Sequence, residues 1–252
     1  MARPITLITG ASAGLGAEFA RQCAERGEEV VLVARRHDRL LEVAKALPGK
    51  SHVVPADLSK EGAAEELLLS IAAKGLMVDT LINNAGFGLV GRFANLPRER
   101  QSEMIDLNVR TLTELAHLVL PGMIERRRGA ILNVASTAAF QAGPHFAVYF
   151  ATKAYVLSFS EALHQELKGS GIKVSALCPG PTATEFGEVA GFKSARFNRF
   201  AADSGSVVRA GLKGLDRNKA VVVPGLMNKV TAQSGRIIPR AAMRRIVARL
   251  KG

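Results

Sequence analysis

Residues 5–16, ITLITGASAGLG, form a short aliphatic run that ends in a glycine-rich turn. The run predicts a β-strand, and residues 17–26 behind it predict a helix. The glycines Gly10, Gly14 and Gly16 would let the backbone approach a pyrophosphate, at which the free N–H groups of the helix would point. Their spacing, Gly-x-x-x-Gly-x-Gly, differs from the commonest dinucleotide fingerprint. The stretch indicates an α/β nucleotide-binding fold, with a tight strand–helix connection as the alternative.

Strands and helices alternate along the rest of the chain. Apolar runs predict further strands at residues 29–34, 51–55, 79–83, 130–135, 172–178 and 220–223, and the intervening patterns predict helices at residues 37–46, 59–74, 98–127 and 148–168. Ser59 is expected to cap the second of these helices, and Pro121 to break or kink the third. This alternation is typical of a doubly wound parallel β-sheet, the Rossmann fold, with about seven strands and helices on both faces. No linker interrupts it, so we expect one domain over residues 1–252.

The net charge of +12 is confined to the last quarter of the chain. Residues 1–191 hold equal numbers of basic and acidic side chains, whereas residues 192–252 hold 14 Lys and Arg against Asp203 and Asp216. Such asymmetry indicates an anionic partner. Residues 236–252 are expected to form a basic amphipathic C-terminal helix. It would pack on its own domain or on a subunit partner, or else make a peripheral membrane contact. Nucleic acid is not expected, because aromatic side chains are absent from this helix.

Composition argues against several other classes of protein. No uncharged apolar run reaches the roughly 18 residues of a membrane span, and the apolar run near the N-terminus is too short for a signal peptide. Cys23 and Cys178 lie far apart, and neither they nor the five histidines have metal-ligand spacing. We expect a cytoplasmic protein with reduced cysteines and no metal.

The end of the second predicted strand indicates which cofactor is used. Sites for NAD place an acidic residue here to bind the ribose 2′-hydroxyl. This chain has Ala34 followed by Arg35 and Arg36, whose guanidinium groups suit a 2′-phosphate. We predict NADP(H), with Arg35 as the first candidate and Arg36 as the second. A solvated arginine pair is the alternative.

A tyrosine and a lysine lie four residues apart in Tyr149-Phe150-Ala151-Thr152-Lys153, with Ser136 upstream. In a helix the two side chains would share one face. A phenol is a weak proton donor at neutral pH because its free pKa is about 10, and a nearby ammonium group lowers that pKa. The pair therefore suits acid–base catalysis, although taken alone it also fits an amphipathic helix with a solvated lysine.

Together these motifs resemble the common single-domain type of the short-chain dehydrogenase/reductase family, whose glycine spacing is the one found here. The matching residues follow the family's order along the chain. They are Thr9-Gly10-x-x-x-Gly14-x-Gly16, Asp57-Leu58, Asn83-Asn84-Ala85-Gly86, Asn108, Ser136, Tyr149-x-x-x-Lys153, and Pro179-Gly180 with Thr182 and Thr184.

The resemblance implies a set of catalytic residues. Tyr149 would donate the proton in carbonyl reduction, or accept it in alcohol oxidation. Ser136 would hydrogen-bond the substrate oxygen, and Lys153 would lower the pKa of Tyr149 and bind the nicotinamide ribose. Asn108 would hold a water linking Lys153 to solvent. Without the family pattern, Ser136 is also explained as a strand end, and Asn108 as a polar residue that bends a helix.

The resemblance also implies where the cofactor binds. Asp57 would bond the adenine amino group beside Leu58, and residues 84–86 would line the adenosine ribose, while the asparagine amides steady the sheet edge. Pro179, Gly180 and Thr182 would lie against the nicotinamide carboxamide and the phosphates. The full predicted set is Gly10, Ser12, Gly14, Leu15, Gly16, Arg35, Arg36, Asp57, Leu58, Asn84, Ala85, Gly86, Tyr149, Lys153, Pro179, Gly180, Thr182 and Thr184. Members of this family form dimers or tetramers, so a homodimer or homotetramer is expected.

Residues 185–204 follow the carboxyl end of a strand, where ligands bind in such sheets. They form a candidate substrate lid, or a surface loop whose phenylalanines complete the core. Phe140, Phe186 and Phe192 hint at a hydrophobic carbonyl substrate, and His145 is a candidate pocket residue.

Two functions follow. The first is an NADP(H)-dependent oxidoreductase that interconverts a carbonyl and a secondary alcohol. The alternative is a non-catalytic NADP(H)-binding sensor or scaffold that acts through its basic tail, which does not require the residues at 108, 136, 149 and 153.

Overall fold

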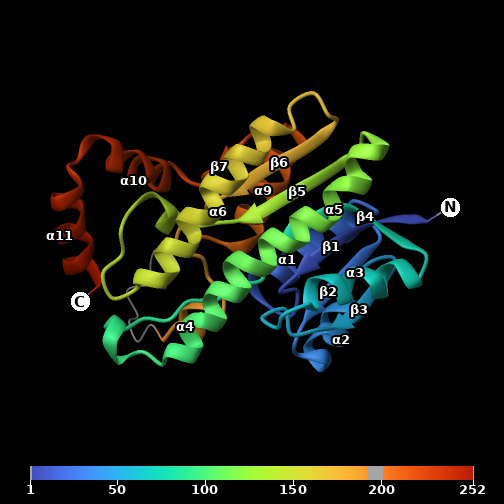
Figure 1. Cartoon of the computed structure of the whole chain (residues 1–252), viewed down its shortest axis with the longest axis horizontal. Helices are drawn as coiled ribbons and strands as arrows, with labels where there is room; N and C mark the ends of the chain where they lie inside the picture. The colour runs from blue at the N-terminus through green and yellow to red at the C-terminus, as the bar shows by residue number, and fades with distance from the viewer. Residues whose placement is uncertain (1, 192–200, 252) are drawn as a thin grey trace.

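The computed structural model describes residues 2–191 and 201–251, in which seven parallel strands form one sheet (Figure 1). The sheet order is β3-β2-β1-β4-β5-β6-β7. The predicted doubly wound sheet is confirmed, and its order reverses direction between β1 and β4. The strands are β1 (Arg3–Thr9), β2 (Val30–Ala34), β3 (Ser51–Pro55), β4 (Leu76–Asn83), β5 (Gly129–Val134), β6 (Ile172–Leu177) and β7 (Val221–Val222).

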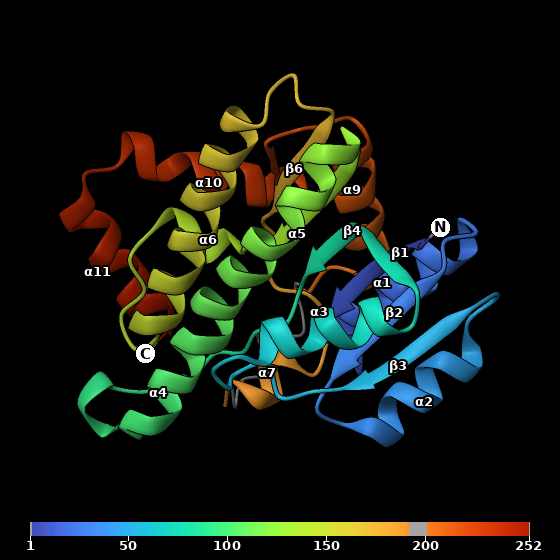
Figure 2. The ribbon, with the colours of Figure 1, turned by 45° about the vertical axis from the view of Figure 1, so that its right-hand side comes forward.

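Helices cover both faces of the sheet (Figures 1 and 2). In the first half of the chain they are α1 (Gly14–Glu25), α2 (His37–Ala46), α3 (Ala63–Ala73), α4 (Arg98–Ile105) and α5 (Leu112–Arg126). In the second half they are α6 (Ala147–Glu166), α7 (Phe186–Val189), α9 (Ser204–Asp216), α10 (Leu226–Ile237) and α11 (Arg240–Lys251). Short 3₁₀ segments lie at Phe93–Asn95 and Thr137–Phe140.

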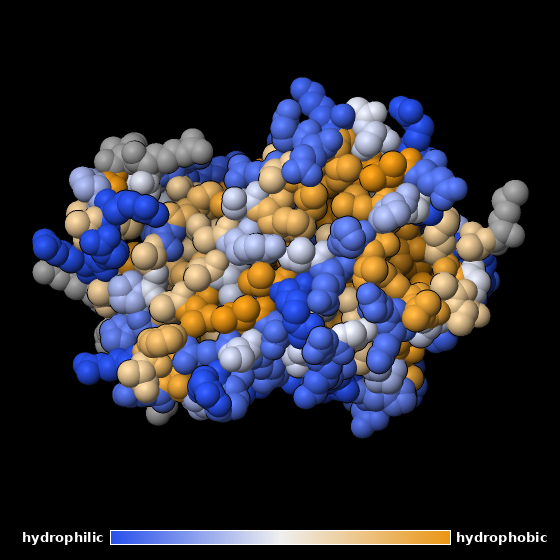
Figure 3. Space-filling view, viewed as in Figure 1, coloured by the Kyte–Doolittle hydropathy of each residue, from blue (hydrophilic) through white to orange (hydrophobic). Residues whose placement is uncertain are grey.

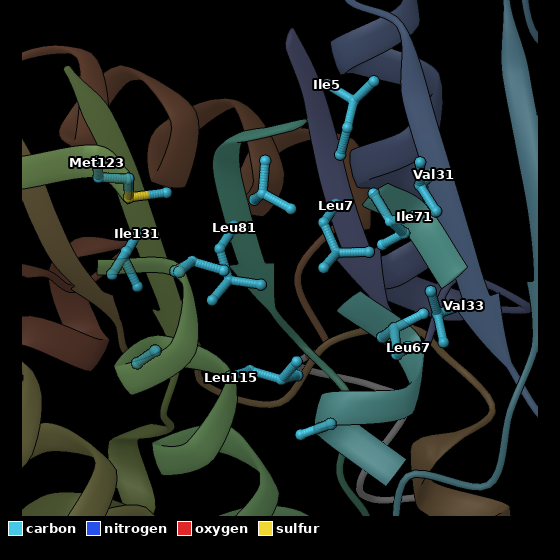
Figure 4. Close-up of a cluster of buried hydrophobic side chains, with 14 of the residues drawn as sticks. Ile5, Leu7, Val31, Val33, Leu67, Ile71, Leu81, Leu115, Met123 and Ile131 are labelled. Atoms are coloured by element: carbon cyan, nitrogen blue, oxygen red, sulfur yellow. The ribbon is translucent and has the colours of Figure 1, made fainter. Parts of the chain in front are cut away.

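The central strands are apolar on both sides because each side faces a helical layer. Leu7 packs with α3 and α5, whereas the next residue, Ile8, packs with α1 and α9, and both are fully buried. Figure 4 shows the first of these clusters, with Leu67 and Ile71 of α3 facing the strands. Truncating such a side chain to alanine typically costs about 2–5 kcal/mol. These two clusters hold the carboxyl ends of the strands in fixed positions, where the candidate site lies.

The long helix predicted at residues 98–127 is interrupted, but not at Pro121. A π-helical segment, Asp106–Thr111, separates α4 from α5, and Pro121 lies inside α5. A proline deprives the carbonyl four residues earlier of its partner. Here Pro121 and His117 are both exposed, so that carbonyl faces solvent, where water satisfies it. The helix therefore does not break at Pro121, and the kink that we gave as the alternative stays a prediction.

Two further boundaries differ from those expected. Ser59 does not cap α3. It donates to the Asp57 carboxylate, and Gly62, with φ of +77°, precedes the helix instead. The basic C-terminal segment is not one helix from residue 236. Residues 236 and 237 end α10, Pro239 follows in the break, and α11 begins at Arg240. The ring of Pro239 disfavours a helical conformation at the residue before it, and Ile238 is extended with ψ of 127°, which explains the division.

Within residues 2–191 and 201–251, no helix is long and apolar enough to cross a membrane. The same part of the chain contains no group of three His, Cys, Asp or Glu side chains arranged to hold a metal ion.

Candidate active site

Helix α6 places Tyr149 and Lys153 one turn apart on its buried face. Ser136 follows the carboxyl end of β5, which neighbours β6 in the sheet. The structure thus brings Tyr149, Lys153 and Ser136 together at the carboxyl ends of the strands, where parallel sheets bind ligands. The Ser136 hydroxyl lies close enough to the Tyr149 phenol to act on its pKa.

Aromatic side chains enclose the Tyr149 ring. Phe146 stacks on it with ring centroids 4.4 Å apart and an interplanar angle of 18°, and the ring of Phe186 lies 5.3 Å away. Burial raises the pKa of the Tyr149 phenol to about 12, and the Ser136 hydroxyl opposes this rise. The phenol is therefore protonated at neutral pH, the form that can donate a proton.

The ammonium group of Lys153 is buried beside this phenol. Its Nζ donates to the Val134 carbonyl at 2.8 Å and lies 5.8 Å from the centroid of the Tyr149 ring. Burial lowers the pKa of Lys153 to about 8. In this arrangement the pKa of Tyr149 lies above its ordinary value, so the lowering that we expected from Lys153 stays a prediction.

Asn108 lies in the π-helical segment and is fully buried. Its Nδ2 donates to the Phe87 carbonyl at 2.9 Å and to Thr152 Oγ1 at 3.1 Å, while its Oδ1 accepts from the Phe87 N–H at 3.1 Å. A Cβ added at Gly86 would lie 2.8 Å from Asn108 Oδ1 and 3.5 Å from Lys153 Nζ. Asn108 therefore clamps the loop after β4 onto α6, and the predicted water link to Lys153 stays a prediction. Such π segments are frequent at functional sites.

Ser136 is held in an extended conformation before the 3₁₀ turn. Its Oγ accepts from the Ala138 N–H at 3.1 Å, and the Thr137 N–H donates to the Pro179 carbonyl at 2.9 Å. These contacts fix the hydroxyl next to the loop that follows β6. Ser136 thus serves both as a structural strand end and as a neighbour of Tyr149.

The glycine-rich turn between β1 and α1 is tightly packed. A Cβ at Gly16 would lie 2.1 Å from the Gly10 carbonyl oxygen, and one at Gly10, where φ is +68°, would lie 2.9 Å from the Ala85 Cα. Asn84 Nδ2 donates to the Thr9 carbonyl at 2.9 Å. A side chain at either glycine would disrupt this packing, and the turn leaves the first N–H groups of α1 free of side-chain caps.

Both predicted arginines stand near this turn, and each forms an ion pair. Arg35 Nη1 lies 3.1 Å from Glu103, and Arg36 Nη2 lies 3.0 Å from Glu185 and 3.3 Å from Ser12 Oγ. Both guanidinium groups are at least half exposed. A cavity of about 830 Å³ opens beside Arg35, lined by Arg35, Asp57, Ser59, Lys60, Arg98, Glu99, Arg100, Ser102, Glu103 and Asp106.

Asp57 faces this cavity from the loop after β3. Burial raises the pKa of its carboxyl, but hydrogen bonds from the Ser59 hydroxyl and N–H, together with Arg35 and Lys60, hold the pKa below its usual value. The neighbouring Leu58 is buried, and its carbonyl accepts from Thr111 Oγ1 at 2.5 Å. Asp57 is thus a fixed anionic acceptor at the end of the sheet that carries the arginines.

The loop after β6 returns to the glycine turn. A Cβ at Gly14 would lie 3.1 Å from the Thr184 Cβ, and one at Gly180 would lie 2.3 Å from Asn228 of α10. Thr182 Oγ1 donates to the Gly180 carbonyl at 3.0 Å. The predicted residues of this loop therefore lie between α1 and α10.

Asn83 is the last residue of β4, so its amide lies at the carboxyl edge of the sheet, where we expected it. It lies between two central strands, where its Nδ2 donates to Asn133 Oδ1 at 3.0 Å, and Asn133 in turn donates to Ser160 Oγ at 2.9 Å. This buried chain ties β4 and β5 to α6. The helix that carries Tyr149 is thereby fixed against the sheet.

Side chains from distant parts of the sequence form an apolar wall around Tyr149. The buried members are Phe87, Met104, Ala138, Phe146, Phe150, Ala190, Met243 and Val247. Figures 1 and 2 show α11, which supplies Met243 and Val247, beside the N-terminal end of α6. Sequence reasoning missed these two residues, although the apolar face of the tail helix pointed to them. It also missed Glu103 and Glu185, for which no local pattern exists.

Residues 185–191, the described beginning of the candidate lid, pack on the site. Phe186 contacts Tyr149, Ala190 is buried in the apolar wall, and the Val90 N–H donates to the Ala190 carbonyl at 3.0 Å. Phe140 does not belong to the apolar wall around Tyr149, but packs against a separate apolar cluster that includes residues of β6. His145 has φ of +62°, and its carbonyl accepts from Gly91 N–H. Phe192 lies outside the described residues.

Comparison with known proteins gives consistent results. A family model described as short chain dehydrogenase matches residues 4–191. The NADP-dependent 3-hydroxy acid dehydrogenase YdfG of Escherichia coli is 37% identical over 187 residues, covering 73% of this chain and 75% of that protein. A short-chain dehydrogenase from Sphingobium yanoikuyae in complex with NADPH is 34% identical with a TM-score of 0.82, and 93% of each chain is covered. The bulky-bulky ketone specific alcohol dehydrogenase from Comamonas testosteroni is 30% identical with a TM-score of 0.77, covering 96% of this chain and 97% of that one.

Proposed function

The chain belongs to the short-chain dehydrogenase/reductase family, and from this we propose that it interconverts a carbonyl compound and a secondary alcohol with NADP(H). The assignment as an NADP-dependent oxidoreductase rests on the family and on relatives that use NADP. The observation that carries the specific reaction is the buried Tyr149 phenol, which lies beside Ser136 and one helical turn from Lys153.

The residues at the carboxyl ends of β1 and β2 fit a dinucleotide with a 2′-phosphate. The glycine turn presents uncapped helix N–H groups, which suit a pyrophosphate. Arg35 and Arg36 offer exposed guanidinium groups, and the Asp57 carboxylate offers an acceptor for an adenine amino group. When bound, the nicotinamide would supply or accept a hydride. In this proposal Leu15, Ala85, Pro179, Thr182 and Thr184 would line the path of the dinucleotide between these ends.

Proton transfer in this proposal belongs to Tyr149. A carbonyl oxygen that gains negative charge needs a proton, and the phenol carries one at neutral pH because even its ordinary pKa is about 10. The Ser136 hydroxyl would stabilise the same oxygen. The Lys153 ammonium, held by Val134, would stabilise the phenolate that remains and so return the pKa of Tyr149 toward neutrality.

We also propose a hydrophobic substrate class. The wall around Tyr149 consists of aromatic and aliphatic side chains, among them Phe87, Phe150 and Met243. Burying apolar substrate surface there would contribute about 25 cal/mol per Å². This favours a bulky ketone, aldehyde or secondary alcohol, with reduction favoured by the NADP(H) preference.

The test is NADPH oxidation with a panel of ketones and aldehydes, and the reverse reaction with alcohols, each with both NADP and NAD cofactors. Tyr149→Phe should lower kcat by about 10²–10⁴-fold, with NADPH still bound. The matched control is Tyr155→Phe, because Tyr155 is the other tyrosine and its hydroxyl pairs with Thr113 on the surface. Full activity in Tyr149→Phe would remove Tyr149 as the proton donor. NADPH binding without turnover of any carbonyl in the native protein would favour the sensor or scaffold instead.

We further propose that the protein is a homodimer or homotetramer. Helices α5 and α6 lie side by side on the face shown in Figure 3, where apolar side chains occur among polar ones. Ile124 of α5 and Tyr155 of α6 are exposed there, and Tyr155 stacks on Phe159. Light scattering on the native protein and on Ile124→Glu tests this, since association through this face should weaken in the variant.

A further inference from the structure

We propose that α10 and α11 form a docking surface for an anionic lipid bilayer. Three large apolar side chains, Leu226, Met227 and Val230, lie on the first turns of α10 and are 79%, 76% and 58% exposed. Their spacing puts them on one side of the helix. Solvent-exposed apolar side chains are normal when scattered, but neighbouring ones indicate an interaction surface.

The same C-terminal part of the chain is rich in cations. The chain has no Asp or Glu after Asp216, but it has Lys or Arg at positions 217, 219, 229, 236, 240, 244, 245, 249 and 251. Lys229, Arg240, Arg244 and Arg245 are exposed. None of these four takes part in an ion pair within the described part of the chain. By contrast, Arg21, Arg35 and Arg110 all pair with carboxylates. The surface therefore combines exposed apolar groups with cations that no protein carboxylate neutralises.

This combination fits a bilayer better than the other occupants. A second copy docked on the same surface would bring two strongly basic regions together, because a two-fold interface pairs each patch with itself. A nucleic acid strand would use the cations but would need aromatic platforms rather than aliphatic side chains. An anionic bilayer uses both, since apolar side chains enter the headgroup boundary while Lys and Arg bind the headgroups.

The orientation of α11 is consistent with this surface. Met243 and Val247 are buried against Phe146, Tyr149 and Phe150, whereas Arg244 and Arg245 are exposed. Met243 and Val247 of α11 are thus occupied by the protein itself, whereas Ile246 is 44% exposed. The larger apolar part of the membrane contact therefore comes from α10, whose three apolar side chains are more exposed.

The test is flotation of the full-length protein with phosphatidylcholine vesicles, with and without phosphatidylglycerol. We expect binding only to the anionic vesicles, and loss of binding at high salt. Each cation near such a surface contributes about a fivefold gain in binding. Reversal of four charges, Lys229→Glu, Arg240→Glu, Arg244→Glu and Arg245→Glu, should weaken binding at least about 100-fold. Replacing the apolar group, Leu226→Ser, Met227→Ser and Val230→Ser, should weaken it about tenfold.

Matched controls carry the same number of changes elsewhere on the surface. The charge control reverses four exposed lysines, namely Lys45, Lys50, Lys74 and Lys168. The apolar control replaces three exposed apolar residues, Leu41, Leu69 and Phe93, by serine. Both should keep nearly native vesicle binding. Thermal unfolding of each variant shows whether it remains folded.

Four results would overturn the proposal. One is no binding of the native protein to anionic vesicles. Another is a loss of vesicle binding in the control variants that equals the loss in the docking-surface variants. Binding would then depend on the total charge of the protein alone. The third is a native oligomer, seen by light scattering, that the α10 substitutions dissociate while vesicle binding is unchanged, which would make this face an interface between copies. Binding to a DNA duplex that is as tight as to vesicles, and unaffected by the apolar substitutions, would likewise assign the surface to polyanions in general.

Discussion

Arg36 donates from Nη2 to a carboxylate oxygen of Glu185 at 3.0 Å, and this contact joins the end of β2 to the segment that begins α7. The two residues are 149 positions apart in the sequence. The next residue, Phe186, contacts the Tyr149 ring. The proposed 2′-phosphate partner and the segment that covers the phenol are therefore linked through one exposed ion pair.

We predict that Glu185→Gln tightens NADPH binding. Glu185 competes with a 2′-phosphate for Arg36, and an exposed ion pair of this kind is worth up to about 1 kcal/mol, or about fivefold in Kd. NADH lacks the phosphate, so its Kd should not change. Fluorescence titration with both cofactors measures this. Glu42→Gln, which removes an exposed carboxylate paired with Arg39 outside the cavity, is the control. An equal gain for NADH would contradict the competition.

Lys153→Met should alter stability in a pH-dependent way. Burial lowers the pKa of this lysine to about 8 in the folded protein, from 10.5. Below about pH 8 Lys153 is charged in both the folded and the unfolded protein, and burial of this charge destabilises the folded protein by roughly 3 kcal/mol. Between about pH 8 and pH 10.5 the folded state has already lost the proton, so the penalty shrinks as the pH rises.

The advantage of Lys153→Met over the native protein in free energy of unfolding should thus be largest near pH 7 and decline toward about pH 10. Urea denaturation across this range measures it. The exposed Lys168→Met is the control, for which the difference should stay nearly constant. An advantage of Lys153→Met that grows with pH would contradict burial as the cause.

Asn108→Ala should destabilise the protein by about 2–4 kcal/mol. The substitution leaves the buried N–H and carbonyl of Phe87 without their partner and frees Thr152. Because the clamp joins the β4 loop to α6, activity should fall as well. Denaturant unfolding measures the loss. Asn95→Ala, at an exposed site, should change stability by less than about 0.5 kcal/mol.

A methyl group at residue 16 should be poorly tolerated. It would lie 2.1 Å from the Gly10 carbonyl oxygen, so Gly16→Ala must displace backbone, at about 3 kcal/mol or more. The control is Gly27→Ala, where φ is +79° but nothing lies within 4 Å of the added Cβ. That change should cost only the roughly 1–2 kcal/mol of left-handed backbone strain. Thermal unfolding of both variants decides whether close packing or conformation dominates.

Met243→Ala should impair turnover of bulky ketones more than that of small ones. Met243 reaches the Tyr149 cluster from α11, and removing its side chain removes contacts that only a bulky substrate would make. A loss of about tenfold in kcat/KM for bulky substrates is expected. Met227→Ala, at an exposed site on α10, should leave both substrate classes unaffected. Equal losses for all substrates in Met243→Ala would indicate a general packing defect.

Local patterns were enough to predict most of the sheet and the helix that carries Tyr149. The helix predicted at residues 37–46 and the strand at residues 51–55 agree with α2 and β3, because periodicity and turn residues define both ends. The interruption in the long helix was misplaced. A proline is visible in the sequence, whereas the π-helical segment forms where Asn108 bonds to Phe87 and Thr152, contacts that depend on the assembled fold.

The same distinction separates the predicted site residues from the missed ones. Tyr149, Lys153 and Ser136 lie in short motifs, so their proximity followed from a helix and a strand end. Glu185 pairs with Arg36, which lies about 150 residues earlier in the chain, and Met243 packs in the cluster of Tyr149, which lies 94 residues earlier. Contacts between residues so far apart produce no hydrophobic periodicity in the sequence. Tertiary packing alone brings them there.

The two faces of α11 bear on how this protein can change over generations. Met243 and Val247 contact the wall around the phenol, while Arg244 and Arg245, their neighbours in the chain, point outward. A substitution that shifts the axis of this helix would move its apolar side chains relative to the wall around the phenol, and would also move its exposed arginines. Substrate preference and the position of the surface charges would then change together. Divergence in one property is then coupled to divergence in the other, and related chains that differ in substrate range should also differ in the tilt and basicity of their last helix.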